Sequence, residues 1–261
     1  MNERIESMAR RLDGAARQRQ AIAQPEGADA PTIDEAYPVQ AALVAHRLAR
    51  GARRIGMKMG FTSRAKMQQM GLSELIWGRL TSDMVCEEGG PLPFDAYIHP
   101  RVEPEVCYLL RKPLEGVVTP MQALDAVEAV APALEVIDSR YRDFRFSLAD
   151  VIADNASSAG VVLGPWQRPD TDVANLGIVL ALDGRAAQVG TTAAILGHPL
   201  RSLVAAARLV AQAGERLEPG SLVMAGGATA AVELRPGATV SAEFQRIGRI
   251  GFQVSASERA R

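Results

Sequence analysis

The sequence predicts an α+β fold: one mixed, mainly β domain with helices gathered at the N-terminus and on one flank. Three observations lead to this prediction. Apolar residues recur at helical spacing near the N-terminus, and short apolar runs separated by glycine and proline breaks follow through the rest of the chain. Few later segments have the pattern of a helix, and no internal repeat or low-complexity tract is present.

Length and composition limit the possible functions. The chain has 261 residues, 48% of them hydrophobic, which is enough for one large domain. Its net charge of −1 gives no electrostatic case for binding nucleic acid or an anionic membrane surface. The two cysteines, Cys86 and Cys107, make neither a disulfide framework nor a zinc site. No apolar leader or membrane-length run is apparent, so we expect a soluble, cytoplasmic protein.

The N-terminal region is predicted to hold two helices. Residues 3–22 have amphipathic spacing, and residues 24–31, with two prolines and a glycine, indicate a linker. Thr32-Ile33-Asp34-Glu35 has the form of a capping box and starts a helix that ends at Gly51. Because Pro38 is unfavourable inside a helix, we expect the regular part to begin later than the box.

The next segment contains a lysine between two methionines. Residues 54–61 are strand-like, and Lys58 could direct a partly buried ammonium at an anionic ligand. On the residues alone, a strand lysine whose charged end reaches water is favoured instead. Segment 62–80, which contains Gly71 and Gly78, is either a lid over a site or a long surface excursion.

Two glutamates stand two residues apart at the start of an apolar strand. Glu103 and Glu105 precede the run 106–110, and since strand side chains alternate, both glutamates face the same side. Two adjacent carboxylates favour a divalent cation such as Mg²⁺, which prefers carboxylate oxygens and keeps coordination positions open for substrate. Two ordinary surface glutamates are the alternative, and the strand alone does not decide between them.

A second acidic run follows at residues 134–138. Either Glu135 or Asp138 could complete a carboxylate triad with the first pair, although Asp138 could also be a turn residue at the strand end. The intervening residues 119–131 are predicted to be a helix, with Pro120 in its first turn.

The remaining elements alternate between short helices, loops and strands. Ser147-Leu148-Ala149-Asp150 has capping-box form, and the small polar loop 154–160 suits a small polar ligand. Asp183-Gly184 predicts a hairpin, and residues 199–213 a helix. The loop Gly226-Gly227-Ala228-Thr229-Ala230 offers backbone N–H groups to an anion or carbonyl. Further strands are predicted at residues 161–163, 176–182, 185–190, 222–225, 240–244 and 250–254.

Several common catalytic arrangements are absent from the sequence. There is no Gly-x-Ser-x-Gly motif, no cysteine nucleophile with a base nearby in sequence, and no dinucleotide-binding fingerprint. The three histidines, His46, His99 and His198, are far apart. The chemistry must therefore come from carboxylates, a metal, one lysine and backbone groups.

Four segments together resemble the hydratase/decarboxylase branch of the fumarylacetoacetate hydrolase superfamily. They are residues 58–67 (KMGFTSRAKM), 98–105 (IHPRVEPE), 134–141 (LEVIDSRY) and 153–158 (ADNASS). The resemblance extends from Thr32 to Val254, nearly the whole chain.

This resemblance implies a mixed β roll with a Mg²⁺ or Mn²⁺ site. The family's metal ligands match Glu103, Glu105 and Glu135, which leaves Asp138 with a supporting role, and the family's lysine matches Lys58. The resemblance and the small polar loops also make Asp154, Asn155, Ser158 and Thr229 candidates for positioning the substrate. We divide the chain into an N-terminal helical region with the lid segment (1–75) and a catalytic mixed β domain (76–261), which form one functional unit.

The implied reaction is metal-dependent decarboxylation of 2-oxo-3-hexenedioate to 2-hydroxypenta-2,4-dienoate and CO₂, in the meta-cleavage catabolism of aromatic compounds. Hydration of 2-hydroxypenta-2,4-dienoate is one alternative, and a non-catalytic dicarboxylate-binding scaffold subunit is another. No histidine matches the histidine–carboxylate pair of the hydrolases, which counts against C–C hydrolysis. The resemblance also implies a homo-oligomer and a complex with a 2-hydroxypentadienoate hydratase.

Overall fold

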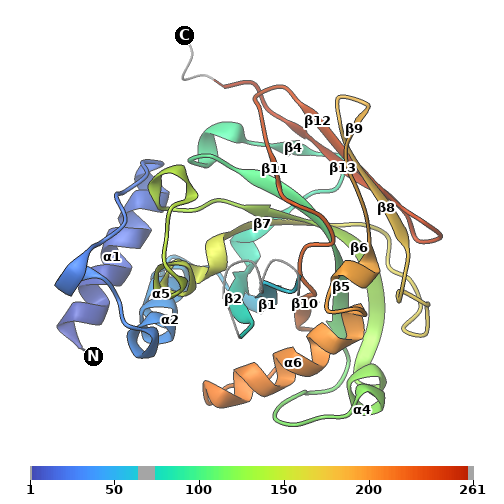
Figure 1. Cartoon of the computed structure of the whole chain (residues 1–261), viewed down its shortest axis with the longest axis horizontal. Helices are drawn as coiled ribbons and strands as arrows, with labels where there is room; N and C mark the ends of the chain where they lie inside the picture. Colours follow the sequence, from blue (N-terminus) through green and yellow to red (C-terminus); the bar gives the residue numbers. More distant parts are fainter. Residues whose placement is uncertain (1, 64–73, 258–261) are drawn as a thin grey trace.

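The computed structural model of the chain describes residues 2–63 and 74–257, and Figure 1 shows how their elements are arranged. The α-helices are α1 (Glu3–Gln18), α2 (Ile33–Ala49), α4 (Pro120–Asp125), α5 (Leu148–Ala153) and α6 (Pro199–Gln212). The 3-10 turns are η1 (Gly27–Asp29), η2 (Ser82–Met84), η3 (Phe94–Ala96), η4 (Arg142–Phe144), η5 (Asn155–Ser157) and η6 (Thr192–Ala194). The strands are β1 (Arg54–Gly60), β2 (Ile76–Thr81), β3 (Val85–Cys86), β4 (Pro91–Leu92), β5 (Arg101–Leu110), β6 (Val127–Ile137), β7 (Ser158–Leu163), β8 (Gly177–Leu182), β9 (Arg185–Thr191), β10 (Leu222–Met224), β11 (Val232–Glu233), β12 (Thr239–Phe244) and β13 (Gly248–Val254).

Two sheets form the β part of the molecule. The eight-stranded sheet has the order β2-β1-β10-β5-β6-β7-β3, with β11 also paired to β5, and the five-stranded sheet has the order β4-β13-β12-β8-β9. Parallel pairs such as β1–β10 and β13–β4 stand beside antiparallel pairs such as β5–β6. The predicted α+β fold, a mixed β roll with flanking helices, is confirmed.

The main hydrophobic core lies on one face of β5 and β6. Val102, Val106 and Tyr108 of β5 point into it, and they pack with Leu203 of α6 and Phe252 of β13. Because the side chains of a strand alternate, the residues between them in β5 point to the other face. A second apolar cluster joins α1, α2 and α5, which lie together on the left in Figure 1.

Several local predictions are confirmed. Thr32 and Ser147 make reciprocal capping boxes with residues three positions later. The Asp183-Gly184 turn joins β8 to β9, and the helix predicted at residues 199–213 forms as α6. These signals depend on neighbouring residues only, which is why sequence reasoning found them.

Two element predictions were wrong. The helix expected at residues 119–131 ends at Asp125, and residues 127–137 form β6, because this apolar run is buried by pairing with β5 along its whole length. The second helix begins at Ile33, directly after its N-cap residue Thr32, and continues through Pro38. Burial of its neighbour Val39 in the α1–α2–α5 cluster offsets the hydrogen bond that proline removes.

The segment expected to be a lid or surface excursion divides into parts. Residues 64–73 lie outside the described residues, whereas residues 76–81 form the buried strand β2. Strand β1, which precedes this segment, pairs with both β2 and β10. The expected N-terminal region and the expected catalytic domain therefore share one sheet.

One segment of the described residues, Thr192–Gln212, has the length and apolar composition of a membrane span, which the sequence reasoning did not expect. Half of its apolar 18-residue window is buried inside the fold. Within it, α6 contributes Leu203, Ala207 and Val210 to the main core.

Candidate metal centre

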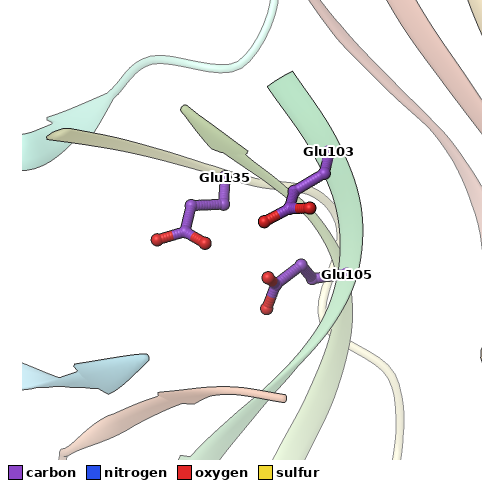
Figure 2. Close-up of side chains that lie close together, drawn as sticks. All are labelled: Glu103, Glu105 and Glu135. Carbon is purple, nitrogen blue, oxygen red and sulfur yellow. The ribbon is translucent and has the colours of Figure 1, made fainter. Parts of the chain in front are cut away.

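Three glutamate carboxylates converge on the face of β5 and β6 opposite the main core (Figure 2). Glu103 and Glu105 extend from β5, and Glu135 lies on β6 directly opposite Glu103 in the register of the two strands. One carboxylate oxygen from each lies within 4.8 Å of the other two. The alternation of β5 thus brings together the carboxylates whose spacing suggested a metal site.

Two of the three carboxylates are completely buried. Glu105 and Glu135 have no exposed surface, and Glu103 is partly buried. Glu105 Oε1 and both carboxylate oxygens of Glu135 accept no hydrogen bond. Buried carboxylate oxygens without donors are costly, and a divalent cation is a partner that can satisfy several of them together. The donor set, all carboxylate oxygen, fits Mg²⁺ or Mn²⁺.

Lys58 extends from β1 into the same group. Its side chain is 4% exposed, its Nζ lies 3.0 Å from Glu135 Oε2, and it donates a hydrogen bond to Ala156 O at 3.1 Å. The contact with Glu135 is an ion pair by distance but is not aligned as a hydrogen bond. The sequence alone had favoured a lysine that reaches water, and the structure instead buries its ammonium among carboxylates.

The pKa values of these groups reflect burial and mutual repulsion. Burial raises the pKa of Glu105 well above its usual range, and the charges of Glu135 and Glu103 raise it further. Burial also raises the pKa of Glu135 to about 7, although Lys58 opposes the shift. For Lys58, burial lowers the pKa but the three carboxylates outweigh it, so the pKa lies above its usual value. The Lys58 ammonium thus interacts with all three carboxylates, and such a set of carboxylate oxygens also suits a divalent cation.

A glycine loop between β10 and β11 completes the acidic side of the site. Gly226 N–H donates a hydrogen bond to Glu105 Oε2 at 2.7 Å, and a Cβ at Gly227 would lie 2.3 Å from Glu103 Oε2. The loop meets β5 in the gap between its two partners, where Pro104 O accepts the Ala228 N–H at 2.9 Å. The expectation that this loop offers N–H groups to an anion is met by a carboxylate of the protein itself.

A cavity of about 250 Å³ opens beside Glu103 and Lys58. Its polar lining includes Thr62, Ser157 and Thr229. Its apolar lining comprises Met59, Phe61, Ile76, Ile137, Phe144, Phe146, Val151, Ala156 and Ala231. The Arg101 guanidinium stacks on the Phe144 ring, 4.1 Å from its centroid, and so fixes part of this wall. This volume is slightly below the usual range for ligand pockets and suits a small substrate.

The structure does not bring all of the predicted substrate-positioning residues to this cavity. Thr229 lines it, but Asp154, Asn155 and Ser158 do not. Asp154 is fully buried and forms an ion pair with Arg140; burial raises its pKa to about 6 against the opposing charge of that arginine.

Asn155 and Ser158 also bond to the protein itself. The Asn155 side chain accepts the Arg79 N–H at 2.7 Å and donates to Arg79 O at 2.9 Å. Ser158 Oγ contacts Met84 Sδ at 3.7 Å. These side chains hold the turn in place rather than lining the cavity.

Asp138, the alternative third carboxylate, has a supporting position. It is buried and accepts the Ile98 and His99 N–H groups at 2.9 and 2.8 Å. It therefore anchors the loop that leads into β5, and Glu135 is the glutamate that joins the cluster.

Sequence reasoning did not single out Ser157 or the aromatic wall formed by Phe61, Phe144 and Phe146. The phenylalanines lie in irregular segments without periodicity, so nothing local indicated their direction. Ser157 belongs to the small polar loop that had been noted, but its neighbour Ser158 was chosen instead.

Comparison with known proteins places the chain in a family. The model of the fumarylacetoacetate hydrolase C-terminal domain matches residues 79–255. The chain belongs to the fumarylacetoacetate hydrolase family.

Members of this family differ in how similar they are to the chain. A 4-oxalocrotonate decarboxylase of Pseudomonas sp. is 64% identical over 97% of this chain and 98% of its own length. A 2-oxo-hept-4-ene-1,7-dioate hydratase of Escherichia coli is 34% identical over 93% of this chain and 95% of its own. The structure of 4-oxalocrotonate decarboxylase from Pseudomonas putida G7, complexed with magnesium and adipate, superposes with a TM-score of 0.92 at 34% identity, covering 97% of this chain and 98% of that one.

Proposed function

We propose that this protein is a metal-dependent decarboxylase that converts 2-oxo-3-hexenedioate to 2-hydroxypenta-2,4-dienoate and CO₂. The observation that carries the proposal is the cluster of Glu103, Glu105 and Glu135 beside the buried ammonium of Lys58. In this cluster Glu105 Oε1 and both carboxylate oxygens of Glu135 are buried and accept no hydrogen bond. Identity of 64% to a 4-oxalocrotonate decarboxylase, against 34% to a hydratase, supports decarboxylation over hydration.

The substrate is a vinylogous β-keto acid, because C5, the carbon that bears the C6 carboxylate, is attached to the C3=C4 double bond, which is conjugated with the C2 carbonyl. As the C5–C6 bond breaks, its electron pair moves along the chain to the C2 oxygen, CO₂ leaves, and one proton on that oxygen gives the dienol. Mg²⁺ or Mn²⁺, held by Glu103, Glu105 and Glu135, would supply Lewis-acid stabilisation of the charge that develops on the C2 oxygen.

Lys58 contributes a fixed positive charge to the same end of the cavity. Its Nζ is held by Ala156 O and by Glu135, so the ammonium is oriented before substrate enters. From there it can donate a hydrogen bond to the substrate carboxylate or to the oxygen that becomes negative. Preorganised charge of this kind needs no rearrangement during the reaction.

The rest of the cavity lining favours loss of the carboxylate. Phe61, Phe144 and Phe146 solvate a neutral molecule better than a charged one, so an apolar wall beside the C6 carboxylate favours CO₂ over carboxylate. Thr229 is the remaining predicted positioning residue that lines the cavity, and we assign it a contact with substrate.

The direct test is CO₂ release from 2-oxo-3-hexenedioate by the purified protein with Mg²⁺, with Mg²⁺ plus excess chelator, and after the metal is restored. We expect turnover only when metal is present. Hydration of 2-hydroxypenta-2,4-dienoate without CO₂ release would instead identify a hydratase. Binding of the dicarboxylate without consumption would identify a scaffold subunit.

We further propose that the enzyme is cytoplasmic and acts in the meta-cleavage catabolism of aromatic compounds. Because the dienol product is unstable in water, its direct transfer to a 2-hydroxypentadienoate hydratase would be useful, and we propose such a complex together with a homo-oligomeric state. Co-purification of the two enzymes and the mass of the complex in solution test both statements.

A further inference from the structure

The Ser157 hydroxyl has no partner in the described part of the chain. The residue is 4% exposed, and its Oγ is buried without a hydrogen bond. A buried hydroxyl in this state has lost its bonds to water and gained none in return. Ser157 lines the cavity together with Lys58, Glu103 and Thr229. The missing partner is therefore expected to be a molecule that enters the cavity.

The backbone holds Ser157 in an unfavourable conformation. Asn155, Ala156 and Ser157 have φ angles of +53°, +52° and +57°, a left-handed region that residues with a Cβ rarely adopt. Ser157 O accepts the Asp138 N–H at 2.8 Å, and Ser157 N–H donates to Asp154 O at 3.0 Å. Strain of this kind persists where the surrounding structure enforces it, and it is concentrated at functional sites.

The same turn fixes the position of Lys58. Ala156 O, the carbonyl just before Ser157, accepts the Lys58 Nζ hydrogen bond, and Nζ lies 3.0 Å from Glu135 Oε2. Ser157 lines the cavity together with Lys58 and Glu103, and the substrate oxygens nearest to the glutamates belong beside these residues. A hydroxyl can donate a hydrogen bond there without adding a negative charge.

We propose that Ser157 Oγ–H donates a hydrogen bond to an oxygen of the 2-oxo acid end of the substrate. This rests on the proposed function for the identity of the substrate, and it adds a substrate-contacting residue to the site. The neighbouring Ser158 provides a matched control, because its Oγ contacts Met84 Sδ and does not line the cavity.

The test measures binding of pyruvate, the smallest 2-oxo acid, by calorimetry in the presence of Mg²⁺. We expect Ser157→Ala to weaken pyruvate binding about tenfold or more, since a hydrogen bond to a charged oxygen is lost. Its Tm should equal or exceed that of the wild type, because an unsatisfied buried hydroxyl has been removed. We expect Ser158→Ala to bind pyruvate within about twofold of the wild type.

A second variant separates loss of the hydroxyl from disturbance of the turn. Glycine accepts the positive φ at this position, so Ser157→Gly removes the same hydroxyl from a relaxed backbone. Weakened pyruvate binding in both Ser157 variants supports the proposal, and wild-type affinity in either one overturns it. A wild-type protein that binds pyruvate with Mg²⁺ but releases no CO₂ from 2-oxo-3-hexenedioate overturns the proposed function alone.

Discussion

Glu105 is fully buried on β5, with one carboxylate oxygen bonded to the Gly226 N–H and the other without a donor. Glu103 and Glu135 face it, and burial together with their charges raises its pKa well above the usual range. Such a residue destabilises the metal-free fold, and in the proposed function the bound metal offsets this cost. We therefore expect the contribution of Glu105 to the free energy of unfolding to change sign when metal is added, from destabilising to stabilising.

We predict that Glu105→Gln stabilises the metal-free protein by about 1 kcal/mol, because one of three facing carboxylates becomes neutral. The wild type should gain about 2.7 kcal/mol of stability when Mg²⁺ is present at a hundred times its Kd, and the variant should lose this gain together with turnover. Differential scanning calorimetry with Mg²⁺ and with chelator measures both effects. Glu128→Gln, at an exposed position of β6, is the control. A variant that keeps the Mg²⁺-dependent stabilisation and full activity would contradict the assignment.

Lys58 can be tested by a neutral side chain of similar length. We predict that Lys58→Met lowers kcat/KM at least about a hundredfold, because a preorganised positive charge beside the reacting oxygen is lost. Metal binding should survive, since the glutamates remain. Steady-state kinetics of CO₂ release and calorimetric titration of Mg²⁺ measure the two properties. Lys112→Met, where the exposed lysine pairs with Asp125, is the control. Unchanged kcat/KM in Lys58→Met would show that this lysine has a structural role only.

At the residue scale, the sequence predicted the side chains whose direction follows from strand alternation. Glu103 and Glu105 share a face of any strand, and Glu135 was supplied by the family motif. Ser157 could not be found in this way, because a left-handed turn at non-glycine residues has no periodic signal. The same limit explains the choice of Asn155, whose side chain bonds to β2 instead.

At the scale of elements, the contact between β2 and η5 controls the position of the turn that holds Lys58. Gly78 of β2 packs against the backbone of Asn155 so closely that a Cβ would lie 2.4 Å from Asn155 O. Two hydrogen bonds between the Asn155 side chain and the Arg79 backbone, one accepted and one donated by the side chain, fix the same junction. The turn can therefore move only if β2 moves with it.

We predict that Gly78→Ala destabilises the protein by about 1–3 kcal/mol, because its methyl group meets backbone that cannot yield easily. A displaced turn should also lower kcat, since Ala156 O then holds Lys58 in a different place. Urea unfolding and kinetics measure both effects. Gly14→Ala is the matched control: Gly14 lies inside α1 with no heavy atom near the added Cβ, and alanine there should stabilise by about 0.5–1 kcal/mol. Equal stabilities of the two variants would show that the junction is loose.

Helices and strands were predicted correctly where the signal was local. The prediction failed where pairing with a distant strand determines the secondary structure. The capping boxes at Thr32 and Ser147 involve residues three positions apart, and both formed. The run from residue 127 onward is apolar enough for helix or strand, and only its pairing with β5 makes it a strand. The short strand β11 was not predicted, because two residues carry no periodicity.

At the scale of the whole molecule, one buried glutamine connects the N-terminal helices to the sheet. Gln40 of α2 has no exposed surface; its Nε2 donates to Trp77 O at 3.0 Å and to Ile152 O at 2.8 Å. Its Oε1 accepts from Arg79 Nη1 at 2.6 Å. One side chain thus joins α2, β2 and α5, and it lies across the division between residues 1–75 and 76–261 proposed from the sequence.

We predict that these two regions unfold together and that Gln40→Ala destabilises the whole protein by about 3 kcal/mol or more, because three buried polar groups lose their partner. Urea unfolding followed by far-ultraviolet circular dichroism and by tryptophan fluorescence should give coincident transitions, since Trp77 is buried where α2 meets β2 and Trp166 is partly exposed on another segment. Gln18→Ala, at an exposed position of α1, should have little effect. Two separate transitions in the wild type would instead show that the N-terminal region is an independent domain. The site would then form when two separately folded domains pack against each other.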